Sequence, residues 1–138
     1  MKKLLIITAL LLIVGVSFGQ SLKKGTVLGT HAISVVLNPD VTLNQYLDFM
    51  NNKLKPEFEK NFPGVQILVL KGTRGENKNG IGMLYVVESV EVRDKYWPKD
   101  GESSEIAKSA LEKMQATMEE WAKMEVDFST KYTDWIIQ

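Results

Sequence analysis

Residues 65–92 read VQILVLKGTRGENKNGIGMLYVVESVEV, and this stretch decides the fold. Its two apolar runs, Val65 to Lys71 and Ile81 to Val92, predict two strands. The polar segment between them, Gly72 to Gly80, contains three glycines and is typical of a β-hairpin loop. We therefore expect two neighbouring antiparallel strands in the middle of the chain.

A helix is expected on each side of this hairpin. Thr42, followed three residues later by Gln45, has the capping-box pattern that begins a helix. Within this first helix, Pro56 predicts either a kink or a separate final turn. The second helix is expected to begin at Ser103 or Ser104, and its apolar stripe comprises Ile106, Ala110, Leu111, Met114, Met118, Trp121 and Ala122.

Two further strands are expected at the ends of the domain, from Thr26 to Leu37 and from Val126 to Ile137. The predicted order is β-α-β-β-α-β, in which each helix joins two parallel strands with a gap between them, and the hairpin fills one gap. This is the ferredoxin-like α+β topology, with a four-stranded antiparallel sheet and both helices on one face. Residues 20–138 suit one such domain, since a chain of this length builds one hydrophobic core.

The first 19 residues have the pattern of a signal peptide. Lys2 and Lys3 precede an apolar run, Leu4 to Val14, that is too short to span a bilayer. Ser17 and Gly19 supply the small residues of a cleavage site. We expect cleavage after Gly19, export to the periplasm or the medium, and no membrane attachment afterwards. The alternative is an uncleaved anchor.

Charge and residue counts exclude several classes of function. The chain has 17 basic and 17 acidic residues, and loss of Lys2 and Lys3 leaves 15 against 17, a net charge of −2. Such a domain, with its charges interspersed, is a poor nucleic-acid binder. Cys is absent and His occurs once, which argues against a structural zinc site. Gly72 to Gly75 lacks the ending of a phosphate-binding loop, and no cofactor is expected.

Both faces of the predicted sheet carry large apolar side chains. In the strand from Ile81 to Val92, one face has Ile81, Met83, Tyr85 and Val87, and the other has Leu84, Val86 and Val90. The last strand likewise places Trp135 and Ile137 opposite Phe128, Tyr132 and Ile136. Because two helices cover only one face, the second apolar face predicts an interface or a ligand site.

The element order, the length and the doubly apolar sheet of residues 26–137 resemble the dimeric α+β barrel superfamily. The resemblance implies a homodimer packed sheet against sheet, with a pocket between sheet and helices in each subunit. Members include cofactor-independent oxygenases, haem-degrading enzymes, isomerases and proteins of no known activity. In the haem-degrading branch the ligand His lies on the second helix, and this chain has no His there.

Five residues are candidates for a site. His31, the only histidine, shares strand parity with apolar neighbours, so it is either a general base or a core histidine. The connection from Arg93 to Glu102 contains Tyr96 and Trp97, which either stack on a flat ligand or cover the edge of the core. Arg93 would pair with an anion, and Tyr85 would assist His31.

Other carboxylates are interpreted as solvated charges. Glu88 and Glu91 have opposite strand parity, as do Asp127 and Asp134, so neither pair can act together. Three hypotheses remain: a homodimer that binds a small apolar or aromatic molecule, a cofactor-independent monooxygenase or isomerase that uses His31 with Tyr85 or Trp97, and a purely structural dimer. A dry His31 would exclude the enzyme, and a filled interior would favour the structural dimer.

Overall fold

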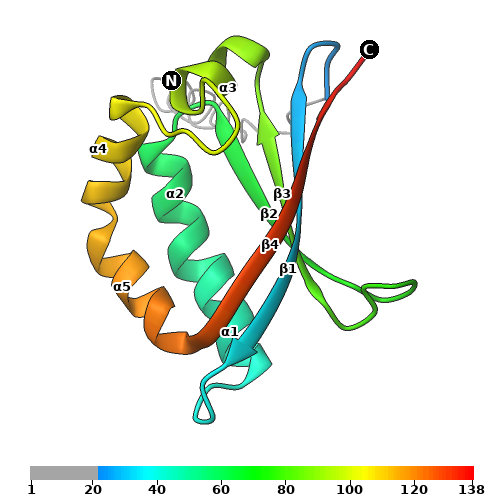
Figure 1. The fold of residues 1–138 in the computed structure, drawn as a ribbon, viewed down its shortest axis with the longest axis vertical. Helices are drawn as coiled ribbons and strands as arrows, with labels where there is room; N and C mark the ends of the chain where they lie inside the picture. Colours follow the sequence, from blue (N-terminus) through cyan, green and yellow to red (C-terminus); the bar gives the residue numbers. More distant parts are fainter. Residues whose placement is uncertain (1–21) are drawn as a thin grey trace, which may run out of the picture.

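A computed structural model describes residues 22–138, so the predicted signal peptide lies outside the described residues (Figure 1). The elements, in chain order, are β1 (Val27–Leu37), α1 (Leu43–Phe49), the π-helical turn η1 (Met50–Leu54), α2 (Lys55–Asn61), β2 (Val65–Lys71), β3 (Ile81–Val87), α3 (Val90–Tyr96), α4 (Glu105–Lys113), α5 (Gln115–Met124) and β4 (Glu125–Ile136).

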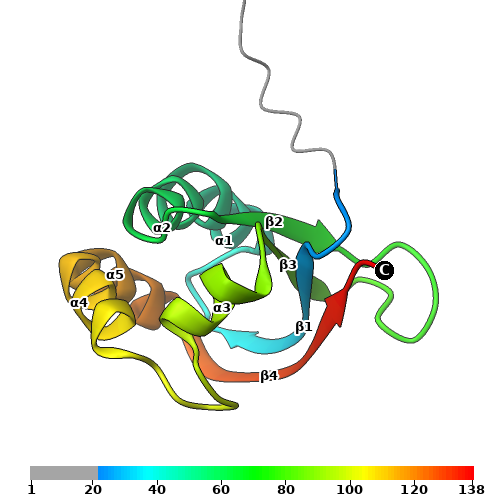
Figure 2. The same cartoon turned by 90° about the horizontal axis from the view of Figure 1, so that it is seen from above.

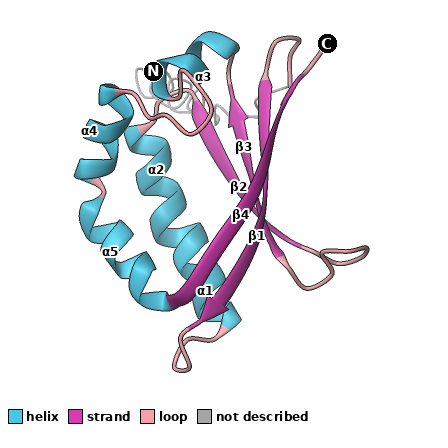
Figure 3. Cartoon of the chain, in the orientation of Figure 1, coloured by secondary structure: helices cyan, strands magenta, loops and turns pink. Residues whose placement is uncertain are grey.

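The sheet has the predicted ferredoxin-like topology. Its strand order is β2-β3-β1-β4, and each pair of neighbouring strands is antiparallel. All the helices lie on one side of the sheet (Figures 1 and 3). Seen from above, α1 with α2 and α4 with α5 form two rows (Figure 2), and the side view places α3 at one end of the sheet (Figure 1).

The first helical segment begins and bends as its sequence requires. The Thr42 hydroxyl accepts a hydrogen bond from the Gln45 amide at 3.3 Å, and the Gln45 side chain accepts one from the Thr42 amide at 2.8 Å, which confirms the capping box. Pro56 has no N–H and its ring crowds the preceding turn. The chain widens into η1 just before it, where the Lys55 amide bonds to the Met50 carbonyl, and α2 is a separate final segment.

The second helical segment has one break. Ser104, and not Ser103, caps α4, because its hydroxyl accepts from the Ala107 amide at 3.2 Å. The helix then breaks at the buried Met114 and continues as α5. Ile106 and Ala122 of the predicted apolar stripe are exposed, so the side that packs on the core is narrower than expected.

The strand predicted from Ile81 to Val92 is too long. β3 ends at Val87, and the Ser89 hydroxyl accepts from the Val92 amide at 3.3 Å to begin α3. Val90 therefore belongs to a helix and not to a sheet face. The predicted irregular connection also changes, since α3 carries Arg93 and Tyr96 before the segment 97–103 begins.

The core lies between the helix-facing side of the sheet and the helices. Its largest fully buried side chains are Tyr46, Tyr96, Phe62, Met50, Ile67, Met114 and Val27. At one edge of this core, the Trp121 indole donates a hydrogen bond to the Tyr46 hydroxyl at 2.8 Å. The same hydroxyl donates to the Glu125 carboxylate at 3.3 Å. Burial raises the pKa of Tyr46 to about 12, so this hydroxyl stays protonated and joins α1, α5 and β4.

The helix-free side of the sheet carries an apolar surface, as predicted. We call this surface the outer sheet patch, and it comprises Leu28, Leu68, Leu70, Leu84 and Trp135, together with Val86, which is already buried at 5% exposure. Leu84 pairs with Leu68 across the β2–β3 ladder, and Leu28 pairs with both Val86 and Trp135. Leu68 is 44% exposed and Trp135 is 59% exposed. Further along β4 this side turns polar, with Asp127, Ser129 and Lys131.

Candidate functional site

A cavity of about 500 Å³ lies between the sheet and the helices. Its floor comes from all four strands, and its walls come from η1 with α2, from α4 with α5, and from α3 with the segment 97–103. By strand alternation, the side chains of Tyr132 and Ile136 in β4 belong to the helix-facing side of the sheet, yet they are 46% and 43% exposed. The helices therefore leave the β4 side of this region open.

Aromatic rings form one continuous wall of the cavity. Phe58 and Phe62 stack at 4.2 Å between ring centroids, and Trp97 stacks on Phe62 at 5.5 Å with the planes 4° apart. Tyr85 meets Phe58 edge to face at 5.7 Å. Trp121 also lines the cavity, from α5. Phe58 and Phe62 are buried in this wall, so the flat apolar surface that it offers to an aromatic ligand comes from the partly buried Tyr85, Trp97 and Trp121.

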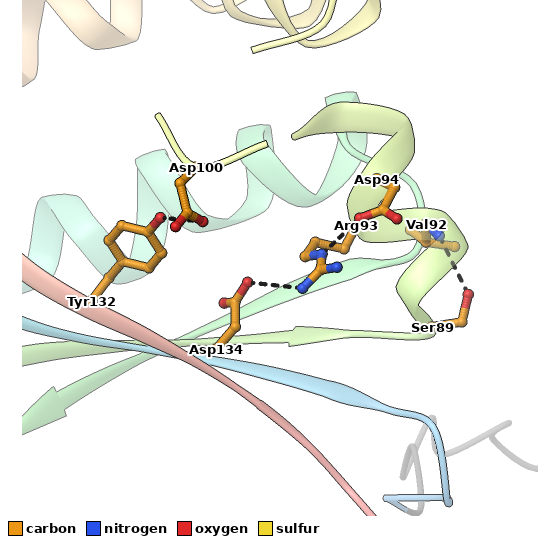
Figure 4. Close-up of polar contacts among 7 residues, drawn as sticks. All are labelled: Ser89, Val92, Arg93, Asp94, Asp100, Tyr132 and Asp134. Carbon is orange, nitrogen blue, oxygen red and sulfur yellow. Dashed lines mark hydrogen bonds and ion pairs between the residues drawn. The ribbon is translucent and has the colours of Figure 1, made fainter. Parts of the chain in front are cut away.

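Charged side chains from α3 and β4 meet where these elements line the cavity (Figure 4). The Arg93 guanidinium bonds to Asp94 at 2.8 Å and to Asp134 at 3.4 Å. The Tyr132 hydroxyl donates to Asp100 at 3.0 Å. Asp134 and Tyr132 project from β4, so these two contacts tie the sheet to α3 and to the segment 97–103 (Figure 4).

His31 lies between these two regions. Its ring is 4.7 Å from Tyr85 and stacks on Tyr132 at 5.5 Å between centroids. Its Nδ1 is 3.4 Å from the Thr130 hydroxyl. Burial lowers the pKa of His31 below 6.5, and the charge of Asp134 opposes this only in part. The imidazole is consequently neutral at pH 7 and lines the cavity.

Gly29 lies in a crowded part of the cavity floor beside His31. A Cβ at this position would lie 3.1 Å from Asp134 Oδ1, 3.4 Å from Tyr85 Cβ and 3.8 Å from His31 Nε2. The absence of a side chain at residue 29 therefore lets these three residues lie close to the β1 backbone. The other carboxylate oxygen of Asp134 is the one that binds Arg93.

The structure brings together four of the five residues that the sequence singled out: His31, Tyr85, Arg93 and Trp97 all line the cavity. Tyr96 does not, because it is 1% exposed, packs on Phe62 at 5.1 Å and donates to the Pro63 carbonyl at 3.1 Å. The prediction of Tyr96 as a ligand-facing residue is therefore corrected to a core position.

Asp134 is the site residue that the sequence analysis missed. It was interpreted as a solvated charge, yet it lines the cavity and pairs with Arg93. Its strand parity is that of Tyr132 and Ile136, and this was the signal that placed it on the helix-facing side. Arg93 is also less available than expected, because two carboxylates already bind it.

Two other kinds of site were sought in residues 22–138. No three His, Cys, Asp or Glu side chains of this part of the chain gather closely enough to hold a metal ion. None of its helices combines the length and the apolar character needed to cross a bilayer.

Comparison with known proteins finds similar chains among the solved structures. No protein-family model matches the chain, and no curated protein matches it significantly in sequence. One similar solved structure is a dimeric protein of unknown function and ferredoxin-like fold from Bacteroides fragilis. The two chains are 14% identical with a TM-score of 0.42, over 83% of this chain and 98% of the other.

Proposed function

We propose that this protein is an exported homodimer that binds a small, largely apolar or aromatic molecule in the cavity between its sheet and its helices. The observation that carries the proposal is a cavity of about 500 Å³ with an aromatic wall and a few polar groups on one side. This volume and composition are typical of small-molecule sites, which usually occupy 300–1,000 Å³. A purely structural module has no need of such a space.

The outer sheet patch supports the homodimer. Its apolar side chains come from all four strands, and several are well exposed in one chain. A contiguous apolar surface in water is costly, and a second copy of the same patch would cover it. Because the patch and the cavity lie on opposite sides of the sheet, two copies can associate without closing either cavity.

The proposal of export rests on the amino-terminal sequence. Two lysines, a short apolar run and small residues at positions 17 and 19 form the signal-peptide pattern. The cleaved protein would act in the periplasm or outside the cell.

A second candidate function is a cofactor-independent monooxygenase or isomerase. The observation in its favour is that His31, held neutral, lines the cavity close to Asp134 and Tyr85. A neutral imidazole can take a proton from a bound molecule. In this case a His31→Ala variant would still bind the molecule but would no longer convert it, as measured by mass spectrometry of the recovered ligand.

The binding function is tested by calorimetric titration of the protein with naphthalene, a flat apolar probe. We expect one molecule bound per chain. Trp97→Ala should weaken binding by about tenfold, because an aromatic contact of the wall is lost. The matched control is Trp135→Ala, on the other side of the sheet, which should leave the affinity unchanged. Equal effects of the two variants, or no binding at all, would contradict the proposal.

A further inference from the structure

We infer that the ligand is an uncharged aromatic molecule with a hydrogen-bond-accepting oxygen, such as an aromatic ketone, and that the Tyr85 hydroxyl donates to this oxygen. The ring of the ligand would lie against the aromatic wall. This inference rests on the proposed binding function and adds the chemistry of the ligand and the residue that recognises it.

Tyr85 belongs to the floor of the cavity. β3 places it between Gly29 of β1 and Ile67 of β2, and both of these residues also line the cavity. The Tyr85 ring lies 5.7 Å from that of Phe58 in α2 and 4.7 Å from that of His31 in β1, measured between centroids. Tyr85 is therefore surrounded by cavity-lining residues of the two neighbouring strands and of the helix that covers them.

The Tyr85 hydroxyl lacks a strong hydrogen-bond partner in the protein. Within residues 22–138 it donates only to Met83 Sδ, at 4.0 Å, and a thioether is a weak acceptor. Burial raises the pKa of Tyr85 to about 12, so the hydroxyl keeps its proton and is sheltered from bulk water. A sheltered donor without a good acceptor is unfavourable, and an acceptor oxygen on the ligand would remove this cost.

Other polar groups of the lining also favour a ligand that accepts hydrogen bonds. The Trp97 indole N–H has no partner within the described residues, and an indole only donates. The carboxylates are already engaged, since Asp94 and Asp134 both bind Arg93. Asp100 likewise accepts from a tyrosine of β4. A ligand with an acceptor therefore meets free donors, whereas a ligand with a donor would compete with the protein at each carboxylate.

The charges around the cavity favour a neutral acceptor over an anion. Five charged side chains line it: Arg93, Asp94, Lys99, Asp100 and Asp134. Lys99 is paired with Glu102 at 3.8 Å, so Arg93 is the cation that an anion would meet, and two carboxylates already bind it. A carboxylate ligand would add a further negative charge to this group, whereas a ketone adds none.

The test compares two neutral probes of nearly the same shape at pH 7. In 2-acetylnaphthalene a carbonyl oxygen occupies the place of the methylene group of 2-isopropenylnaphthalene. Each probe is titrated calorimetrically into the wild-type protein and into Tyr85→Phe, so that the different hydration of the two probes cancels. Tyr85→Phe should weaken binding of the ketone by about tenfold, because a buried acceptor loses its donor, and leave binding of the hydrocarbon unchanged. Retained hydrocarbon binding also shows that the variant is folded.

Tyr132→Phe is the matched control, because Tyr132 also lines the cavity but its hydroxyl already donates to Asp100. This variant should leave the affinities for both probes close to those of the wild-type protein.

Two further measurements examine the acceptor directly. The infrared C=O stretch of bound 2-acetylnaphthalene should lie at lower wavenumber in the wild-type protein than in Tyr85→Phe, since a hydrogen bond weakens the carbonyl bond. A third probe, 2-naphthoate, should bind less tightly than the ketone.

The possible failures are distinguishable. If Tyr85→Phe weakens neither neutral probe, weakens both equally or leaves the C=O stretch in place, the assignment to Tyr85 is overturned and the binding function stands. An equal loss of ketone affinity in Tyr132→Phe would overturn the same assignment. Tighter binding of 2-naphthoate than of the ketone would overturn the uncharged ligand class. If neither neutral probe binds the wild-type protein, both the inference and the proposed function fail.

Discussion

At the scale of single residues, His31 has the environment that responds most directly to pH. Its ring is half-buried between Tyr85 and Tyr132, and burial holds its pKa below 6.5. The unfolded chain exposes the imidazole to water, where its pKa returns to about 6.5. As the pH falls from 7, the unfolded chain takes up a proton at His31 before the folded chain does.

We therefore predict that His31 makes the protein less stable as the pH falls from 7 toward 5. The free energy of unfolding, measured by urea titration, should decrease over this range more steeply in the wild-type protein than in His31→Gln. Carboxylates titrate in both proteins, including Glu125, whose pKa is raised by burial, so their contribution cancels in the comparison. Parallel curves for the two proteins would show that His31 is as free in the fold as in the unfolded chain.

The sequence predicted part of the site at this scale. Strand parity was enough to place His31 and Tyr85 on the same side of the sheet, since side chains alternate along a strand. Parity also applied to Asp134, but a lone Asp in a strand is usually solvated, and its partner Arg93 lies 41 residues away. The burial of Tyr96 depends on which side of α3 faces the core, and no local sequence pattern specifies that side.

At the scale of elements, the segment 97–103 is held at its middle and at its carboxyl end. Tyr132 of β4 donates to Asp100 in the middle, and Ser104, which follows the segment, connects α3 to α4. The Ser104 hydroxyl donates to the Lys95 carbonyl at 2.8 Å and accepts from the Ala107 amide at 3.2 Å. The segment thus forms part of one wall of the cavity, where Trp97 also stacks on Phe62.

We predict that Ser104→Ala lowers the free energy of unfolding by about 1 kcal/mol, because α4 loses its N-cap. Chemical denaturation measures this change. Ser103→Ala is the control, since the cap hydrogen bond comes from Ser104, and its effect should be much smaller. If Ser103→Ala costs as much as Ser104→Ala, the assignment of the cap is wrong.

The boundaries of the strands and helices were harder to predict from the sequence than their order. The order of strands and of long helices followed from periodicity and capping, as the capping box at Thr42 illustrates. The boundary between β3 and α3 did not follow from these patterns, because apolar residues continue from the strand into the helix between positions 81 and 92. Ser89, a residue type that favours helix N-caps, was the local signal for this boundary.

At the scale of the whole molecule, the two sides of one sheet have separate roles in the proposal. The helix-facing side forms the cavity floor, and the outer sheet patch is the surface that we propose for a second copy. The apolar character of both sides was predicted from strand alternation. The volume of the cavity was not, because it depends on how far the helices lie from β4.

We predict that the protein is a dimer by light scattering at micromolar concentration and that Leu68→Lys makes it a monomer. The substitution places a charge within the outer sheet patch, where burial against a second copy would be costly. Ile106→Lys is the matched control, since Ile106 is 53% exposed on α4, away from the patch, and it should leave the dimer intact. A monomeric wild-type protein would contradict the homodimer.

The most direct test of the cavity as a binding site uses the three tryptophans, because two line it and one does not. In a ¹⁵N-labelled sample titrated with naphthalene, the indole N–H signals of Trp97 and Trp121 should shift together and saturate. The signal of Trp135, on the helix-free side, should stay in place. Unchanged Trp97 and Trp121 signals, or a shift confined to Trp135, would contradict a ligand site between the sheet and the helices.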